Sequence, residues 1–227
     1  IRVFVLDVKE TSRLPQVIVS QAHPEIVREL FELEVPEIED GIVEIKSIAR
    51  EAGFRTKLAV WSNDPSVDSV GACIGPRGSR IQTIVGELKN EKIDIVRYSQ
   101  DPVEYIVNAL SPARIISVDI LADDENRKEV FVIVPDDPLS LAIGREGQNV
   151  RLAHRLTGWK IDIKSETQAR AMEDEREKQM LEEMKAQEEQ QEQAVEQEVE
   201  QVLEEDEKVL GEAQDEVQEE QAQEEDA

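Results

Sequence analysis

The stretch CIGPRGSRI, Cys73–Ile81, decides the fold of this chain. Two glycines three positions apart, Gly75 and Gly78, flank a proline and an arginine where a helix is expected to begin. The same pattern returns 69 residues later as AIGREGQNV, residues 142–150. In both copies an isoleucine precedes the first glycine, and an apolar residue stands three positions after the second. Repetition at a fixed offset predicts a tandem pair of similar units.

The residues around each loop predict the same order of elements, α-β-β-α-loop-α-β. In the first unit, a helix that Pro36 ends is followed by strands at 42–50 and 56–62, helices at 67–74 and 79–88, and a strand at 93–99. In the second unit, strands are expected at 115–121 and 129–134, with a helix on each side of the loop and a closing strand. Each unit is small for an independent core, so we expect the two to pack against each other.

The first residues of the chain predict a β-hairpin. Two alternating apolar runs, IRVFVLDV and PQVIVSQ, flank the polar segment KETSRL. The hairpin is too small to form a core, and we interpret it as the closing strands of a β-domain. Because residue 1 already lies within a strand pattern, we expect the chain to be a fragment of a longer protein.

The charge of the chain is distributed unevenly. The formal net charge is −26, but residues 166–227 hold 25 acidic and only 5 basic residues. Residues 1–165 are closer to balance, so the overall acidity does not exclude nucleic acid as a partner. The last 62 residues also contain 12 glutamines and no proline or aromatic residue. This composition predicts a low-complexity acidic tail that is disordered or a fluctuating helix.

Several classes of function are disfavoured. Cys73 is the only cysteine, so no internal disulfide can form, and we expect it to pack as a core thiol. The longest apolar run, residues 130–134, is too short to cross a membrane, and the first residues lack the pattern of a signal peptide. These features favour a cytoplasmic protein that does not associate with membranes.

We find no constellation of residues for catalysis, a metal or a cofactor. His23 and His154 have no cysteine or histidine cluster near them. The carboxylates of ADDEN and PDDP suit turns and helix caps. Trp61 and Trp159 lie at strand ends, where we expect core or domain contacts. Neither loop has the lysine of a nucleotide-binding P-loop, and each follows a helix where that motif follows a strand.

The repeated loop does carry chemistry suited to phosphate. Glycine lacks a Cβ, which lets the backbone turn tightly and approach a ligand. The unpaired N–H groups and dipole of the following helix favour an anion. Arg77 and Arg145 lie between the glycines, and Arg80 and Arg151 follow. KH domains use this arrangement to clamp about four nucleotides. A lone G-x-x-G more often caps a helix, but its repetition in the same context favours RNA binding.

Longer phrases resemble the bacterial NusA family of transcription termination and antitermination factors. The phrases are FELEVPEIEDGIVEIKSIAREAGFRTKLAV, DSVGACIGPRGSRIQTIVGELKNEKIDIV and LAIGREGQNVRLAHRLTGWKIDI. The resemblance covers residues 1–165 and implies an α+β protein with tandem KH domains of the bacterial type. Residues 1–22 would end an OB-type RNA-binding barrel, 23–100 and 101–165 would form the KH domains, and 166–227 the acidic tail. A polymerase-binding N-terminal domain would lie outside this fragment.

The resemblance also implies a set of RNA-binding residues. The first clamp would comprise Gly75, Pro76, Arg77, Gly78 and Arg80. The second clamp would comprise Gly144, Arg145, Glu146, Gly147, Gln148 and Asn149, with Arg151 just beyond. Arg55 and Lys57 are added on charge alone. Because a carboxylate repels phosphate, Glu146 predicts a weaker second clamp or one that contacts a base edge.

The partners implied are single-stranded nascent RNA, RNA polymerase and other transcription antitermination factors. The protein would be a monomeric, non-enzymatic factor that modulates pausing, termination and antitermination. One alternative is the KH module of another RNA machine, such as a ribosome-assembly GTPase or an exoribonuclease. Another is an interaction protein whose acidic tail is the active element. That tail either competes with RNA for the KH face or serves as a solubilising tether.

Overall fold

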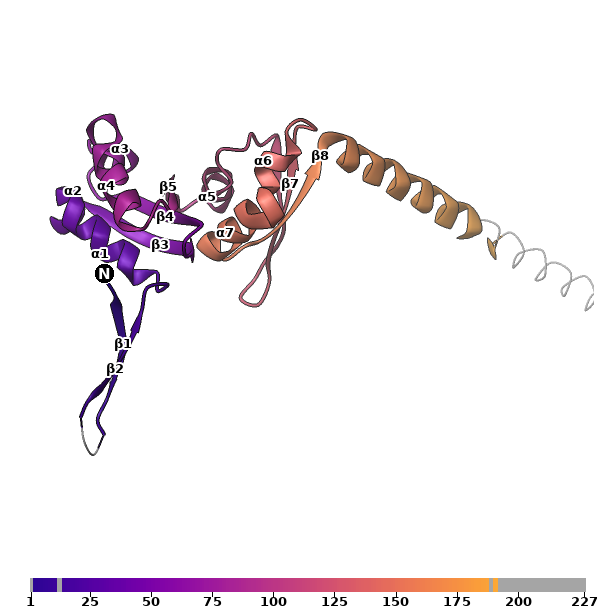
Figure 1. The fold of residues 1–227 in the computed structure, drawn as a ribbon. Coiled ribbons are helices and arrows are strands. Elements are labelled where there is room, and N and C mark those ends of the chain that lie inside the picture. Colours follow the sequence, from indigo (N-terminus) through magenta and orange to yellow (C-terminus); the bar gives the residue numbers. More distant parts are fainter. Residues whose placement is uncertain (1, 12–13, 188–189, 192–227) are drawn as a thin grey trace, which may run out of the picture. The chain divides into compact units, whose positions relative to one another are not determined.

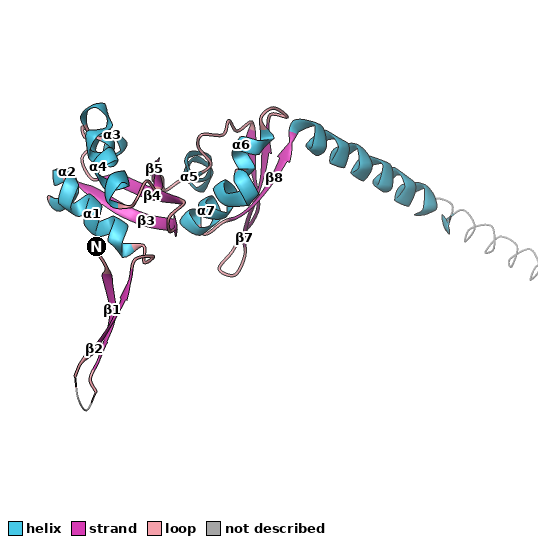
Figure 2. Cartoon of the chain, viewed as in Figure 1, coloured by secondary structure: helices cyan, strands magenta, loops and turns pink. Residues whose placement is uncertain are grey.

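The computed structural model describes residues 2–11, 14–187 and 190–191 (Figure 1). The chain divides into two units, Ile1–Ala169 and Arg170–Ala227. Every strand of the described residues belongs to the first unit, and these strands form three open sheets (Figure 2). Both G-x-x-G loops also lie within the first unit.

An antiparallel hairpin begins the chain. Strand β1 (Phe4–Lys9) pairs with β2 (Gln16–Ser20), and the register shifts between Val5 and Asp7. Apolar side chains on both strands, Val5, Val8 and Val17 among them, are about half exposed. At the base of the hairpin the Phe4 ring stacks on His23, with ring centroids 4.3 Å apart. This two-stranded sheet is the predicted hairpin, and its sheet does not close into a barrel.

The first KH unit follows the predicted order with one addition. Its elements are α1 (Glu25–Glu34), α2 (Pro36–Glu39), β3 (Val43–Glu51), β4 (Arg55–Ser62), α3 (Ser69–Ile74), η1 (Pro76–Gly78), α4 (Ser79–Glu87) and β5 (Lys92–Arg97). Val35 is extended, because a residue before proline avoids the helical region. Pro36 thus ends α1 as predicted, and it also begins the short helix α2, where proline fits the first position.

The second KH unit repeats this order without the extra helix. Its elements are α5 (Pro102–Ala109), β6 (Ser117–Asp123), β7 (Lys128–Val134), α6 (Leu139–Ile143), η2 (Arg145–Gly147), α7 (Gln148–Thr157) and β8 (Lys160–Ser165). In both sheets the central strand is antiparallel to the strand before it in sequence and parallel to the last one. The shared topology confirms that the 69-residue offset reflects a structural repeat.

Two hydrophobic cores hold the first unit together. One belongs to the first KH unit and includes Phe31, Leu58 and the buried Cys73. Burial raises the pKa of the Cys73 thiol to about 12, which makes it a packing group. The other core joins Ala49, Ala59 and Val96 of the first sheet to the helices of the second unit. The two KH units therefore share one core, as their small size led us to expect.

A helix at residues 166–187 follows β8 directly. Ser165 and Gln168 form a capping box: the Ser165 N–H donates to Gln168 Oε1 at 3.1 Å, and the Gln168 N–H donates to Ser165 Oγ at 3.3 Å. Thr167 adds hydrogen bonds from its N–H and hydroxyl to Asp136. This part of the predicted acidic tail is thus helical, and residues 192–227 lie outside the described residues. No helix among the described residues is long and apolar enough to cross a membrane.

Candidate nucleic-acid interface

The two G-x-x-G loops have nearly the same backbone conformation. The first glycine of each has φ/ψ of 74°/172° in Gly75 and 76°/171° in Gly144. Two positions later, Arg77 and Glu146 both adopt the left-handed region, with φ of 55° and 54°. Non-glycine residues rarely adopt such angles, so both loops hold the same uncommon turn. Each loop lies between a short helix and a longer one, α3 and α4 or α6 and α7.

The first glycine of each loop is required by close packing. A Cβ on Gly75 would lie 2.6 Å from Cγ of Arg80. A Cβ on Gly144 would lie 2.7 Å from the backbone nitrogen of Asn149. The helix that follows therefore approaches each loop so closely that any side chain at the first glycine would have to displace a neighbouring residue.

The second glycine has a different role. Gly78 and Gly147 have positive φ, but a Cβ on Gly147 would meet nothing within 4 Å, and one on Gly78 would only touch flexible side chains at 3.7 Å or more. These glycines are the N-caps of α4 and α7, and neither makes a side-chain cap. The first N–H of each helix, in Ser79 and Gln148, donates to the carbonyl of Pro76 or Arg145. The other first-turn N–H groups have no capping side chain, an arrangement that favours an anion.

In the first loop, the predicted residues divide into exposed and supporting groups. Pro76 and Arg77 are exposed, and Arg77 makes no ion pair within the described part of the chain. Arg80 instead donates hydrogen bonds to Glu37 at 2.8 Å and to the Ala72 carbonyl at 2.7 Å. Arg77 is thus the cation that a ligand of this loop would meet first, whereas Arg80 braces the loop.

The second loop carries one arginine and one glutamate, so its charges balance. Arg145 and Glu146 have side chains 92% and 82% exposed, and Arg145 Nε lies 3.7 Å from Glu146 Oε1. Asn149 is buried, and its Nδ2 donates to the carbonyls of Leu110, Leu141 and Ala142. Asn149 therefore supports the loop from within, and its side chain is not presented at the surface.

Two further residues of the second loop contact the first KH unit. Gln148 Nε2 donates to Glu51 Oε2 at 2.8 Å, and Arg151 Nε donates to Glu51 Oε1 at 2.6 Å. Arg155 adds an ion pair to the same carboxylate at 3.7 Å. Hydrogen bonds from Arg151 and Gln148 lower the pKa of Glu51, so it is ionised at neutral pH. Sequence patterns gave no signal for Glu51, because its partners lie about 100 residues away.

Arg55 and Lys57, proposed on charge alone, occupy different environments. Arg55 makes two hydrogen bonds to Asp94, at 2.7 and 2.9 Å. Lys57 is fully buried, and its ammonium contacts Asp94 at 3.1 Å and the Ser111 carbonyl at 3.0 Å. Burial lowers the pKa of Lys57, while Asp94 opposes that shift. Lys57 thus connects the two KH units and is not at a surface that RNA could reach.

A cleft of about 600 Å³ lies between the second loop and the first KH unit. The first unit contributes Glu51, Gly53, Phe54, Arg55, Asn90 and Lys92. The second contributes Gly144, Arg145, Glu146, Gln148 and Arg151. Sequence reasoning missed Lys92 and the exposed Phe54, an aromatic on which a base could stack. The sequence did offer a signal for Phe54 as an RNA contact: it is an aromatic residue in a tight turn, with Gly53 before it and Arg55 after it.

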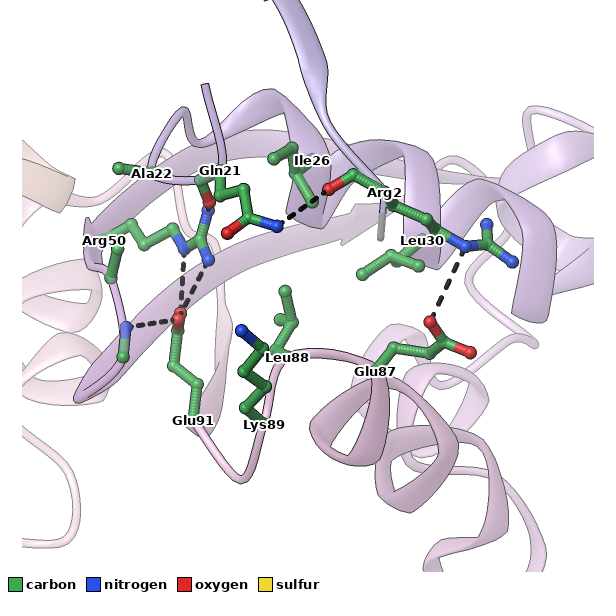
Figure 3. A pocket seen from close by; sticks show the side chains of 12 residues that line it. Arg2, Gln21, Ala22, Ile26, Leu30, Arg50, Glu87, Leu88, Lys89 and Glu91 are labelled. Carbon is green, nitrogen blue, oxygen red and sulfur yellow. Dashed lines mark hydrogen bonds and ion pairs between the residues drawn. The ribbon is translucent and has the colours of Figure 1, made fainter. Parts of the chain in front are cut away.

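A buried ion pair between Arg50 and Glu91 holds the turn that carries Phe54, and Figure 3 shows this pair where it lines a neighbouring pocket. Arg50 and Glu91 form two hydrogen bonds of 2.9 Å, and the Gly53 N–H donates to Glu91 at 2.8 Å. Burial alone would raise the pKa of Glu91, but these hydrogen bonds lower it overall. Arg50 also donates to the carbonyls of Gln21 and His23, which follow the hairpin. The network therefore fixes one wall of the cleft and the chain entering the first KH unit.

Family models match both halves of this arrangement. The model described as the NusA-like first KH domain matches residues 21–98, and the NusA-like second KH domain matches residues 102–171. The chain belongs to the NusA family. The α+β class and tandem KH fold predicted from the sequence are thereby confirmed. Each G-x-x-G loop lies within one of these two matched ranges.

Curated NusA proteins resemble the chain closely. The transcription termination/antitermination protein NusA of Halalkalibacterium halodurans is 58% identical over 172 residues, which are 76% of this chain and 44% of that protein. The Bacillus subtilis protein of the same name is also 58% identical over 172 residues, 76% of this chain and 46% of its own length. The Mycobacterium tuberculosis protein is 52% identical over 166 residues, 73% and 47% of the two chains. The chain spans less than half the length of these NusA relatives.

Proposed function

We propose that this chain binds single-stranded RNA through its two G-x-x-G loops, as part of a factor for transcription termination and antitermination. The factor would act on nascent RNA during elongation and would modulate pausing by RNA polymerase. It would work in the cytoplasm as a monomer, without an enzymatic activity, alongside other antitermination factors. The names of the relatives support the process.

One observation carries the RNA-binding proposal. Two loops 69 residues apart share an uncommon backbone, and each leaves a helix N-terminus uncapped by side chains beside an exposed arginine. Backbone N–H groups bind phosphate oxygens without regard to base identity, so such loops would hold the RNA backbone. Single-stranded RNA is favoured over a duplex because each KH domain clamps about four nucleotides with the bases splayed.

The geometry separates groups that would contact RNA from groups that support the site. The exposed side chains are those of Arg77, Arg145 and the cleft residues Phe54 and Lys92, and the half-buried Gly78 and Gly147 would offer backbone beside them. Arg80, Asn149 and Lys57 would act by holding the loops and the two KH units in place. We therefore place RNA on the loops and on the cleft between the units.

A KH module of another RNA machine would use the same loops, but the names of the relatives favour a transcription factor. An interaction protein that acts through its acidic residues would not need the loops at all. An experiment can separate these functions. The transcription factor and the KH module of another RNA machine both require an intact G-x-x-G backbone, whereas the interaction protein does not.

The test is the double variant Gly78→Asp/Gly147→Asp, assayed with a mixed-sequence single-stranded RNA. Both positions have room for a side chain, and aspartate tolerates positive φ better than most residues, so the fold should persist. The added carboxylates would lie where phosphates bind. We expect affinity to fall more than about a hundredfold, because like charges opposed in an interface cost several kcal/mol.

The matched control is Gly41→Asp. Gly41 also has positive φ, at 71°, and has nothing within 4 Å of its Cβ position, but it lies in neither loop. The control should bind RNA as the unmodified chain does. Normal RNA binding by the double variant would contradict the proposal, as would an equal loss in the Gly41→Asp control.

A further inference from the structure

Glu51 occupies the donors that a phosphate would need at the second loop. Its carboxylate accepts hydrogen bonds from the side chains of Gln148 and Arg151, the first and fourth residues of α7. Arg151 also donates to the carbonyl of Glu146 at 3.3 Å. The guanidinium fork fits carboxylate and phosphate in the same way, so one anion excludes the other from the same face of Arg151.

The carboxylate is held in this position by the fold. Glu51 is the last residue of β3 and pairs with Arg55 across the strands. Its neighbour Arg50 is fixed by the buried ion pair with Glu91. Because successive strand residues point to opposite faces, fixing Arg50 on one side directs Glu51 toward the other, where α7 lies. The side chain of Glu51 is only 18% exposed, so the contact is partly shielded from solvent.

The contact between Glu51 and Arg151 changes the balance of charge in the cleft. The basic residues that line it are Arg55, Lys92, Arg145 and Arg151, and the acidic ones are Glu51 and Glu146. Arg55 is already paired with Asp94. With Glu51 on Arg151, two cations of the cleft are neutralised by carboxylates of the first KH unit.

We infer that Glu51 is an internal competitor of RNA at the second G-x-x-G loop. It binds Arg151 and Gln148 in the unliganded protein, and an RNA phosphate has to displace it to reach these donors. Glu51 thereby lowers the affinity of the second loop and makes it selective for RNA that also engages the rest of the cleft. This inference rests on the proposed function, since it concerns the same RNA-binding surface.

The first test compares Glu51→Gln with Glu129→Gln, using single-stranded RNA over a range of salt concentrations. Glu129 is a matched control: its side chain is 16% exposed, and it pairs with Arg127 and Lys160 outside the cleft. We expect Glu51→Gln to bind RNA about threefold more tightly, with a salt slope steeper by about 0.7, the value for one more phosphate neutralised on a single strand. Glu129→Gln should leave the slope unchanged. Weaker RNA binding by Glu51→Gln, or an equal change in both variants, would overturn the inference.

The second test is a double-mutant cycle with Arg151→Gln. If Glu51 covers Arg151, removing Arg151 should weaken RNA binding about threefold more in the Glu51→Gln background than in the unmodified chain. An equal effect in both backgrounds would also overturn the inference.

The unmodified chain and Gly147→Asp separate the possible failures. If the unmodified chain does not bind RNA, or if Gly147→Asp leaves binding unchanged, the proposed use of the second loop fails. If Gly147→Asp weakens binding but Glu51 and Arg151 show no coupling, only the role of Glu51 fails. Thermal unfolding of each variant checks that the fold is retained.

Discussion

The two G-x-x-G loops differ in their side chains while sharing a backbone. The third residue of each G-x-x-G loop has a left-handed backbone conformation, and it is Arg77 in the first loop and Glu146 in the second. Below the first glycine, a long arginine side chain braces the first loop, whereas a buried asparagine supports the second. The comparison teaches that the repeated backbone supplies the phosphate-binding geometry, and that the side chains set how strongly each copy binds.

The surroundings of the loops increase this difference. Arg77 has no carboxylate partner within the described residues, so it is available to a ligand. In the second loop Arg145 is next to Glu146, and Arg151 is bound by Glu51. We therefore expect the first loop to bind RNA more tightly than the second.

The largest expected effect comes from blocking one loop at a time. Gly78→Asp should weaken RNA binding about thirtyfold and Gly147→Asp about fivefold, because the first loop provides the unopposed cation and so more of the binding free energy. Fluorescence anisotropy with one labelled RNA measures both. A larger loss for Gly147→Asp would reverse the ranking of the loops.

A second comparison concerns stability. Alanine at either first glycine must adopt φ near +75° with ψ near 170°, a region almost restricted to glycine, which costs about 1 to 3 kcal/mol. At Gly75 the new Cβ meets an arginine side chain that can shift, whereas at Gly144 it meets the backbone nitrogen of Asn149. Gly144→Ala should therefore lower the free energy of unfolding by about 2 kcal/mol more than Gly75→Ala. Urea unfolding measures the difference, and equal losses would show that the two loops are braced alike.

The smallest effect isolates the charge at the third position. Arg77→Gln should weaken RNA binding about threefold and flatten the salt slope by about 0.7. Glu146→Gln should strengthen binding by a similar factor, because it removes a carboxylate from the loop. Titrations at three salt concentrations would show the opposite signs. Changes of the same sign would mean that the two positions do not face phosphate in equivalent ways.

The repeat and the loops could be predicted from the sequence because their signals are local. Glycines at fixed spacing, apolar residues at helical spacing and alternating strands each depend on neighbours a few positions away. The capping box of Ser165 and Gln168 is also a local pattern that could have been predicted, but the acidic composition that follows it suggested a tail without fixed structure. Local patterns therefore gave the fold and the position of the candidate site.

The roles of individual charged residues could not be predicted in this way. Arg80 and Lys57 read as cations for RNA, yet their partners are Glu37, Asp94 and a carbonyl of the second KH unit. Such contacts join residues 37 to 54 positions apart, and no spacing rule identifies them. The same limit concealed Glu51, whose partners depend on how the two KH units pack.

Crosslinking tests the central claim, that both loops and the cleft contact RNA, most directly. Single-stranded RNA carrying photoreactive bases would be bound to the chain, irradiated and digested, and the joined residues identified by mass spectrometry. We predict crosslinks at residues 75–80, at residues 144–151 and at Phe54 of the cleft. Crosslinks confined to the hairpin or to the helix at residues 166–187, with none at either loop, would contradict the account.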